Sequence, residues 1–465
     1  MSHYFGTDGV RGRVGEAPMT VDFALRLASA AARVLAPEGG RVLIGKDTRV
    51  SGYMFESALE AGFVAAGVDV LLMGPLPTPG IAYMTQRLNC SFGVVISASH
   101  NRYDDNGIKF FDGNGSKLSD SVERRIEELL DSPVVTRDSK RLGKASRTDR
   151  SRYQYQEFCA STIPAGMTLE GFKIVIDCAN GAGYKVAPRV FADLGAEIVP
   201  IGCSPNGRNI NDGCGSTEPQ LLQLTVPGVR AQVGVALDGD GDRVTMVDEL
   251  GRCVDGDQLL YILARAAHQA GTLKGPVVGT VMSNLGLEQS LAELGIDFRR
   301  AQVGDRYVLA MLQELGGTLG GETSGHILCL DKTTTGDGMI SALQVLAVMK
   351  ATGAGLAELC APMPKYPQVL LNVRVARRFD PKSEPSVVEI AEAVERRFNG
   401  RGRIVLRASG TEPLIRVMVE GYDAAMVKAG ARDIAAAVEA VAARAAAAGA
   451  AAVGAPGLAV TGPRG

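Results

Sequence analysis

Hydrophobic positions along the chain follow one recurring pattern: an unbroken apolar run, a polar or glycine-rich loop, an amphipathic segment, and a second short apolar run. The pattern occurs three times, at residues 41–74, 172–202 and 275–304. An apolar run without alternation is typical of a strand buried in a parallel sheet, and a glycine after an amphipathic segment is typical of a helix end. Each copy therefore predicts a βαβ unit, and the three copies predict three related α/β domains.

The C-terminal part of the chain has a different pattern. A strand is predicted at 370–375, a helix at about 386–398 that Asn399-Gly400 ends, and a strand pair with the sequences RIVLR and IRVMVEG around a loop. Asp423 suits the N-cap of a closing helix. This order of elements predicts a smaller α+β domain.

The patterns together predict an α/β protein of four domains. A chain of 465 residues is too long for one hydrophobic core, which agrees with several domains. The alanine-rich end has too little sequence complexity to bury a core and is predicted to be disordered. The predicted boundaries are 1–148, 149–254, 255–366 and 367–448 for the domains and 449–465 for the tail.

The charge balance narrows the classes of partner. The chain has 49 Lys and Arg residues against 51 Asp and Glu residues, a net charge of −2, with both signs well mixed. We therefore expect neither nucleic-acid binding nor a membrane patch, and favour a small molecule as partner. The eight cysteines form no C-x-x-C pair. We expect no secretory signal or membrane span, and hence a cytoplasmic protein in a reducing compartment.

The strongest chemical motif is VGVALDGDGDRVTMVD, in which single glycines separate Asp238, Asp240 and Asp242. Carboxylates this close repel one another unless a cation neutralises them, and hard oxygen ligands favour Mg²⁺ or Ca²⁺. An EF-hand loop is the rival interpretation, because Glu249 would take its twelfth position. Arg243 stands where that loop needs glycine, and the flanks are strand-like, which argues against an EF-hand. A solvated acidic turn is the simpler alternative, and we favour the metal.

A second motif, SASHN, follows the apolar run Val94–Ile96 and delivers two hydroxyl groups, a histidine and an asparagine at a strand end. Strand ends are where α/β proteins bind ligands. Ser99 could therefore be a nucleophile, but a turn residue or a helix cap explains it locally as well.

Three further loops carry polar side chains that suit a phosphorylated sugar. LGGETSGHILCL offers groups that bind sugar hydroxyls, whereas RIVLRASGTEPLIR offers guanidinium, hydroxyl and amide groups that cradle a phosphate. FGTDGVRG and NGIK add Arg11 and Lys109, although a lone basic residue is usually a solvated charge. The members of the first loop are Glu322, Ser324, Gly325 and His326, and those of the second are Arg407, Ser409, Gly410, Thr411 and Arg416.

The chemical motifs fall one in each of the four predicted domains. A strand-end hydroxyl, a metal cage, a polyol-binding loop and a phosphate cradle are complementary parts of one site. This distribution predicts a single central cleft where the four domains meet, with a phosphorylated sugar as ligand.

With these motifs the chain resembles the α-D-phosphohexomutase superfamily over nearly its whole length. The ordered set SASHN, DGDGDR, GExSGH and RxSGTEP carries the resemblance. Further motifs fit best the bacterial branch that acts on glucosamine phosphates: FGTDGVRG, GKDTRVSGYM, VGDRYVL, LDKTTTGDG and SGTEPLIRVMVEG. The sequence departs from the family pattern at two positions. Arg102 stands where the family usually has proline, and Thr323 fills the variable position of GExSGH, where this branch more often has glutamine or asparagine.

The resemblance implies a mutase that interconverts glucosamine 6-phosphate and glucosamine 1-phosphate, on the route to UDP-N-acetylglucosamine and the cell wall. The implied reaction passes through glucosamine 1,6-bisphosphate, with Ser99 donating and then recovering a phosphoryl group. The resemblance also suggests a homodimer. A phosphatase and a non-catalytic phosphosugar sensor are the alternatives; a sensor needs neither Ser99 nor the aspartates.

The family's pattern also implies a role for each motif residue. One Mg²⁺ per subunit is held by Asp238, Asp240, Asp242 and a phosphoserine oxygen on Ser99. Arg11 and Arg243 neutralise charge during transfer. Lys109, His100 and His326 are the candidates for general acid and base. The implied substrate-binding residues are Glu322, Ser324, Gly325 and His326 for the sugar and Arg407, Ser409, Gly410, Thr411 and Arg416 for the non-reacting phosphate.

Overall fold

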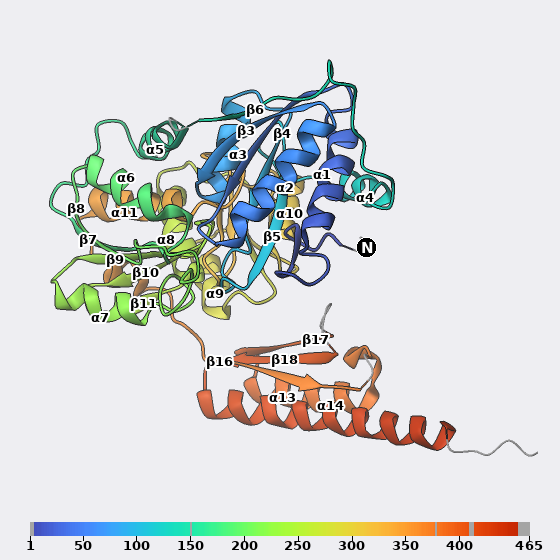
Figure 1. Cartoon of the computed structure of the whole chain (residues 1–465). Helices are drawn as coiled ribbons and strands as arrows, with labels where there is room; N and C mark the ends of the chain where they lie inside the picture. The colour runs from blue at the N-terminus through green and yellow to red at the C-terminus, as the bar shows by residue number, and fades with distance from the viewer. Residues whose placement is uncertain (1–3, 149–150, 377–378, 409–412, 454–465) are drawn as a thin grey trace, which may run out of the picture. The chain divides into compact units, whose positions relative to one another are not determined.

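A computed structural model describes residues 4–148, 151–376, 379–408 and 413–453 of the chain (Figure 1). The chain divides into two compact units. The larger unit consists of Met1–Ser283 and Ser290–Met363, and the smaller of Asn284–Gln289 and Pro364–Gly465. Within the described residues, the structure contains no helix that combines the length and the apolar character needed to cross a membrane.

The first sheet of the larger unit has six strands in the order β1-β5-β4-β2-β3-β6. Strands β4, β2, β3 and β6 run parallel, and β5 and β1 continue the sheet in antiparallel pairing. The strands are β1 (Val10–Arg13), β2 (Gly40–Lys46), β3 (Val68–Pro75), β4 (Phe92–Ile96), β5 (Asp105–Asp112) and β6 (Ala145–Arg147). The helices are α1 (Val21–Leu35), α2 (Ser51–Ala65), α3 (Thr78–Arg87) and α4 (Asp120–Glu128).

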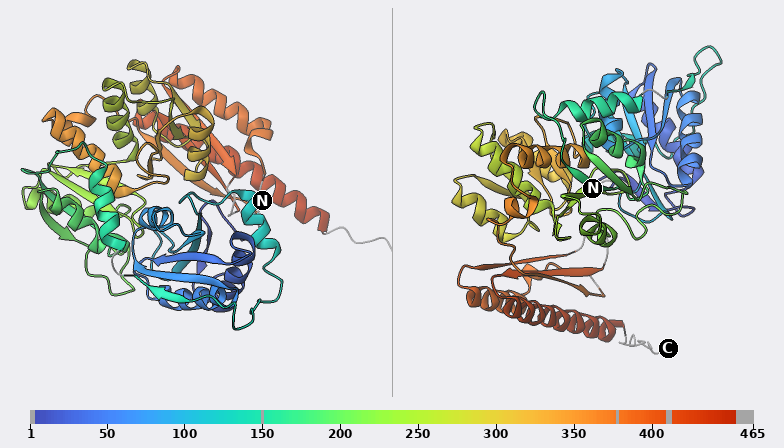
Figure 2. Two further views of the ribbon diagram at one scale, coloured as in Figure 1. Left: turned by 90° about the horizontal axis from the view of Figure 1, so that it is seen from above. Right: turned by 90° about the vertical axis from the view of Figure 1, so that its left-hand side faces the viewer.

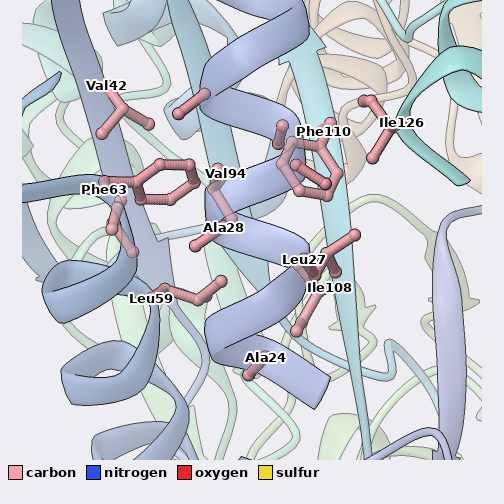
Figure 3. Packing of buried hydrophobic residues seen from close by; sticks show 14 of the residues in the cluster. Ala24, Leu27, Ala28, Val42, Leu59, Phe63, Val94, Ile108, Phe110 and Ile126 are labelled. Carbon is pink, nitrogen blue, oxygen red and sulfur yellow. The ribbon is translucent and has the colours of Figure 1, made fainter. Parts of the chain in front are cut away.

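Helices α1, α2 and α4 pack on one face of this sheet and close its core (Figure 3). The alternation of a strand directs Val42, Val94 and Phe110 to that face, where they meet Leu27 of α1 and Phe63 of α2. Burial of each large apolar side chain stabilises the fold by about 1.5–3 kcal/mol. This core fixes β4 and β5, and therefore the loop between them.

The second and third sheets complete the larger unit, with strand orders β11-β10-β9-β7-β8 and β13-β12-β14-β15. The second sheet consists of β7 (Lys173–Asp177), β8 (Glu197–Ile201), β9 (Val233–Leu237), β10 (Val244–Asp248) and β11 (Cys253–Val254), and the third of β12 (Val277–Thr280), β13 (Phe298–Ala301), β14 (Leu319–Gly321) and β15 (Ile327–Cys329). The accompanying helices are α5 (Ser151–Ser161), η1 (Ala182–Lys185), α6 (Ala187–Asp193), α7 (Gln220–Gly228), α8 (Gly256–Gln269), α10 (Asp305–Leu315), α11 (Gly338–Thr352) and α12 (Leu356–Cys360). Helix α9 (Leu285–Glu293) is divided between the units, because residues 285–289 belong to the smaller one.

The three sheets repeat one strand plan, β3-β2-β4-β5, β8-β7-β9-β10 and β13-β12-β14-β15. In each, three parallel strands are followed by a fourth that returns antiparallel to the third. The three predicted βαβ units and the α/β fold class are thus confirmed. SASHN, DGDGDR and GETSGH all occupy the turn between the third and fourth strand of their repeat.

The smaller unit is a three-stranded antiparallel sheet covered on one face by two helices (Figure 2). Asn399, with φ +48°, ends the first helix in the left-handed conformation that was predicted from Asn399-Gly400. Asp423 caps the second helix by accepting the Met426 N–H at 2.8 Å. The elements are β16 (Gln368–Arg374), η2 (Pro381–Ser383), α13 (Pro385–Phe398), β17 (Gly402–Ala408), β18 (Leu414–Gly421) and α14 (Ala424–Val453). Of the predicted tail, residues 454–465 lie outside the described residues.

Candidate functional site

The SASHN and DGDGDR turns meet inside the larger unit. The hydroxyl of Ser99 donates a hydrogen bond to Asp238 Oδ2 at 2.6 Å, although 139 residues separate the two in sequence. Gly239 makes this approach possible, since a Cβ there would lie 2.6 Å from the Ser99 carbonyl oxygen. Ser99 is 1% exposed, so its hydroxyl is shielded from bulk water. The structure therefore brings the predicted nucleophile and the predicted metal motif together.

Asp238, Asp240 and Asp242 form a compact acidic cluster. One carboxylate oxygen from each lies within 4.8 Å of the others, and all three residues are buried. Within the described residues, Oδ1 of Asp240 and Oδ1 of Asp242 accept no hydrogen bond. Burial, together with the charges of Asp242 and Asp240, holds the pKa of Asp238 well above its usual range. Buried, converging oxygens with unused lone pairs fit a hard divalent cation.

Lys109 on β5 provides the nearest positive charge to this cluster. Its Nζ lies 2.8 Å from Asp240 Oδ2, 2.8 Å from Asp8 Oδ2 and 3.5 Å from Asp242 Oδ2. Burial alone would lower the pKa of Lys109, but these carboxylates outweigh it and raise the pKa. The ammonium group is therefore charged and held in place at neutral pH.

Arg11 and Arg243 also reach the acidic cluster. Arg11 pairs with Asp8, and Nε of Arg243 lies 4.0 Å from Asp242 Oδ1. Burial opposes the charge on each guanidinium, but the surrounding carboxylates raise the pKa of both. Both predicted arginines therefore lie in the same charged environment as Ser99.

A row of charged side chains, most of them only partly exposed, continues from this cluster to the third sheet. Lys117 Nζ lies 2.6 Å from Asp8 Oδ1 and also pairs with Asp305, and His326 Nε2 lies 3.3 Å from Asp305 Oδ2. Asp8, Lys117 and Asp305 were not among the predicted site residues. Asp8 and Asp305 do lie inside FGTDGVRG and VGDRYVL, so the motifs contained a signal for them. Lys117 has no such signal.

The two histidines near the site differ in charge. His326 is buried, which by itself would lower its pKa, but the carboxylates of Asp305 and Asp242 raise the pKa to about 9. His100 has its Nδ1 3.3 Å from the Ser99 hydroxyl oxygen. Burial and the nearby charges of Arg243 and Arg11 lower the pKa of His100 to about 4. At pH 7 His326 is therefore protonated and His100 is neutral.

The GETSGH turn packs directly on the metal motif. The Gly325 carbonyl accepts the Val244 N–H at 3.0 Å, and a Cβ on Gly325 would lie 1.9 Å from the Val244 carbonyl oxygen. Only glycine fits this contact. Glu322 accepts the Gly304 N–H at 2.9 Å, and Ser324 is exposed. Thr323, one of the two departures, donates to Asp257 Oδ2 at 2.8 Å at the start of α8.

The predicted phosphate loop lies in the smaller unit. Arg407 on β17 and Arg416 on β18 are directly opposed in the antiparallel register. Burial and the charge of Arg416 lower the pKa of Arg407. Two guanidinium groups opposed on neighbouring strands form a donor set that suits a phosphate. Ser409, Gly410 and Thr411 lie outside the described residues.

Models of four domains of one protein family match the chain in order. They are described as phosphoglucomutase/phosphomannomutase alpha/beta/alpha domain I (residues 2–134), domain II (154–251), domain III (255–366) and the C-terminal domain (370–437). Together with the fold and the site, these matches define the class of the protein as a phosphohexomutase and confirm the four-domain α/β prediction.

Relatives and solved structures narrow the class. The chain is 56% identical over 439 residues to a phosphoglucosamine mutase of Pseudomonas fluorescens strain Pf0-1, covering 94% of this chain and 99% of that protein. It is 57% identical over 439 residues to that of Azotobacter vinelandii, with the same coverage. The chain belongs to the phosphoglucosamine mutase family, which confirms the branch that the motifs indicated.

Solved structures share the fold over 94–95% of this chain. A phosphoglucomutase/phosphomannomutase family protein from Burkholderia thailandensis superposes with a TM-score of 0.78 at 23% identity, covering 95% of this chain and 98% of that one. N-acetylphosphoglucosamine mutase of Aspergillus fumigatus, solved with GlcNAc-6P and magnesium, gives 0.69 at 19% identity, with coverages of 94% and 96%. At these identities the likeness concerns the fold alone.

Proposed function

We propose that this protein interconverts glucosamine 6-phosphate and glucosamine 1-phosphate through a phosphoserine at Ser99 and a 1,6-bisphosphate intermediate. The observation that supports this most is the buried Ser99 hydroxyl, which donates to Asp238 of the acidic cluster, where Lys109 and Arg243 face the neighbouring aspartates. Sequence identity of 56–57% with phosphoglucosamine mutases supports the amino sugar as substrate.

The acidic cluster is proposed to hold one Mg²⁺. The residues fit the ion because three buried carboxylates converge within 4.8 Å and two of their oxygens accept no hydrogen bond from the part of the chain that the structure describes. The contact between Ser99 and Asp238 supports a phosphoserine oxygen as the proposed further ligand. When bound, the ion neutralises charge on the phosphoryl group.

The proposed transfer moves one phosphoryl group between two oxygens. The bond between phosphorus and Ser99 Oγ breaks, and a bond forms between phosphorus and a sugar hydroxyl oxygen, which gives the bisphosphate. Transfer of the other phosphoryl group from the sugar to Ser99 then regenerates the enzyme. Arg11, Arg243 and Lys109 are already ion-paired in the site, so they stabilise the charge without rearranging.

The sugar hydroxyl loses a proton as it attacks, and a base must accept it. Of the three candidates, Lys109 and His326 are held protonated by carboxylates, whereas His100 is neutral at pH 7. His100 lies 3.3 Å from the Ser99 oxygen, near the place of transfer. We assign the base role to His100 and a hydrogen-bond donor role to His326.

The remaining predicted residues are proposed to bind the substrate away from the reacting phosphoryl group. Glu322, Ser324 and Gly325 contact the sugar hydroxyls in both orientations of the bisphosphate. The opposed arginines of the smaller unit support the phosphate role, since two neighbouring guanidinium groups offer several donors to one anion. The residues proposed to bind the non-reacting phosphate are Arg407, Ser409, Gly410, Thr411 and Arg416.

A product assay separates this function from its alternatives. The protein is incubated with glucosamine 6-phosphate, Mg²⁺ and a trace of glucosamine 1,6-bisphosphate, and the phosphorylated products are measured. Glucosamine 1-phosphate as the main product supports the mutase, free phosphate would indicate a phosphatase, and binding without turnover would indicate a sensor. Intact-protein mass spectrometry adds a check on the residue: a phosphate-sized mass increment is expected that Ser99→Ala lacks.

A further inference from the structure

Ser99 has a backbone conformation that its side chain does not favour. Its φ is +51°, in the left-handed region where residues other than glycine are strained. The local hydrogen bond from Ser99 N–H to Ser97 Oγ, at 2.9 Å, is one restraint on this turn. A strained residue persists only where its surroundings over-determine it. The residues that hydrogen-bond to the Ser99 carbonyl oxygen are the surroundings that hold this conformation.

Arg49 holds the turn from the first sheet. Its side chain is fully buried, and its Nη2 donates to the carbonyl oxygens of Ser99 at 3.0 Å and Asn101 at 2.7 Å. Nη1 donates to the Asp105 carbonyl at 3.0 Å and also to the carbonyl of Arg102. Nε pairs with Asp47 Oδ2 at 2.7 Å. One guanidinium thus fixes four carbonyl groups of the turn.

Asn211 holds the same two carbonyl groups from the second sheet's side. Its Nδ2 donates to the carbonyl oxygens of Ser99 and Asn101, both at 2.9 Å, and the residue is 3% exposed. Its own N–H donates to the Ala179 carbonyl at 2.9 Å, which ties it to the loop after β7. A Cβ on Gly239 would lie 2.7 Å from the same Nδ2. The amide therefore sits between the Ser99 carbonyl and the metal motif.

Arg102 extends this link on the surface. Its side chain pairs with Asp212 at 2.7 Å, and both side chains are about half exposed, at 62% and 48%. An exposed pair of this kind contributes little to stability. The departure from proline at this position is thus accommodated without displacing Arg49 or Asn211 from the turn.

We infer that Asn211 and Arg49 are positioning residues for phosphoryl transfer. Both donate hydrogen bonds to the Ser99 carbonyl oxygen, from two sides, and thereby hold the Ser99 hydroxyl against the acidic cluster. The inference rests on the proposed function of Ser99. Neither side chain contacts the Ser99 hydroxyl, so both act through the backbone. Their loss should slow the chemical step and leave substrate binding almost unchanged.

Asn211→Asp is the sharpest test, because the two side chains have nearly the same size and both tolerate a left-handed backbone. The carboxylate cannot donate to the two carbonyl oxygens and would be repelled by them. We expect kcat to fall by roughly 10- to 100-fold, as for a small displacement of a reacting group, with KM within about threefold. Asp212→Ala, which removes the neighbouring exposed pair, is the matched control and should retain at least about half of kcat.

The outcomes distinguish this inference from the proposed function. If wild type and Asp212→Ala convert glucosamine 6-phosphate and Asn211→Asp loses kcat, the result supports both the mutase function and the positioning role. Unchanged kcat in Asn211→Asp, or a rise in KM alone, overturns the positioning role while the mutase stands. Absence of conversion by wild type overturns the mutase itself. If Asn211→Asp does not fold, Asn211→Ser, which keeps one donor, should show an intermediate kcat, and wild-type kcat there would also refute the role.

Discussion

Replacing Lys109 by methionine removes the ammonium group from the acidic cluster while nearly preserving the side-chain volume. The Nζ is in contact with Asp8 and Asp240, each at 2.8 Å, and the side chain is 3% exposed. The substitution leaves the buried Asp240 carboxylate without its nearest cation and removes one of the cations that surround Asp8. Removing one partner of a buried ion pair costs about 3–5 kcal/mol. The thermal midpoint of the larger unit should therefore fall by roughly 5–15 °C when no metal is present.

Magnesium should reduce that loss. The ammonium of Lys109 competes with a bound cation for the Asp240 carboxylate, so Lys109→Met should bind Mg²⁺ at least about tenfold more tightly than wild type. A tenfold difference in affinity corresponds to about 1.4 kcal/mol of recovered stability at saturating metal. The variant should nevertheless lose activity, because Lys109 is proposed to stabilise the transferring phosphoryl group.

The assay compares thermal unfolding of both proteins in a chelator and in excess Mg²⁺. Lys117→Met is the matched control, since among the described residues Lys117 pairs with Asp8 and Asp305 rather than with the acidic cluster. Lys117→Met should have a lower thermal midpoint than wild type, and Mg²⁺ should raise that midpoint no more than it does for wild type. A loss below about 1 kcal/mol for Lys109→Met in chelator, or equal responses to Mg²⁺ in the two variants, would refute the reasoning.

Three further predictions concern the remainder of the larger unit. Leu27→Ala, which opens a cavity between α1 and the first sheet, should lower the free energy of unfolding by about 2–5 kcal/mol in urea titrations. Iodoacetamide should label Cys203, whose pKa the Cys178 thiol lowers, well before Cys329, whose pKa burial raises to about 12, as read by peptide mass spectrometry. Burial raises the pKa of Asp337 from 3.8 to about 6, so its stabilising contribution is complete below about pH 4 and lost as the pH rises through 6. The free energy of unfolding of wild type in chelator should therefore fall by about 3 kcal/mol between pH 4 and 7, relative to Asp337→Asn. Parallel pH profiles of the two proteins would contradict this.

Much of the fold followed from local sequence patterns. Unbroken apolar runs marked the parallel strands, and Asn399-Gly400 and Asp423 marked helix ends, because backbone geometry and capping depend on neighbouring residues. The chemical motifs were recognisable for a related reason. Aspartates separated by single glycines repel one another unless a ligand is bound, and a serine followed by histidine at a strand end is unusual without one. The domain boundaries, the cytoplasmic location and the homodimer stay predictions.

The pairing of Asp8, Lys117 and Asp305 could not be predicted from sequence patterns, although the motifs FGTDGVRG and VGDRYVL contain Asp8 and Asp305. These residues come from segments separated by 109 and 188 positions, and each alone resembles an ordinary surface charge. Only burial makes their pairing necessary, and burial is a property of the packed unit. The same holds for the histidines, whose pKa values are moved in opposite directions by charges from other loops.

The sequence by itself determined which elements form, which loops carry chemistry and which family the chain resembles, because each of these depends on short-range order. The tertiary structure decided which of those loops come into contact. It placed Gly239 against the Ser99 carbonyl, Gly325 against Val244, and Asn211 between the two strand-end turns. Such contacts join residues that are more than 80 positions apart, so no local pattern encodes them, and they arise only when three copies of the same strand plan pack together.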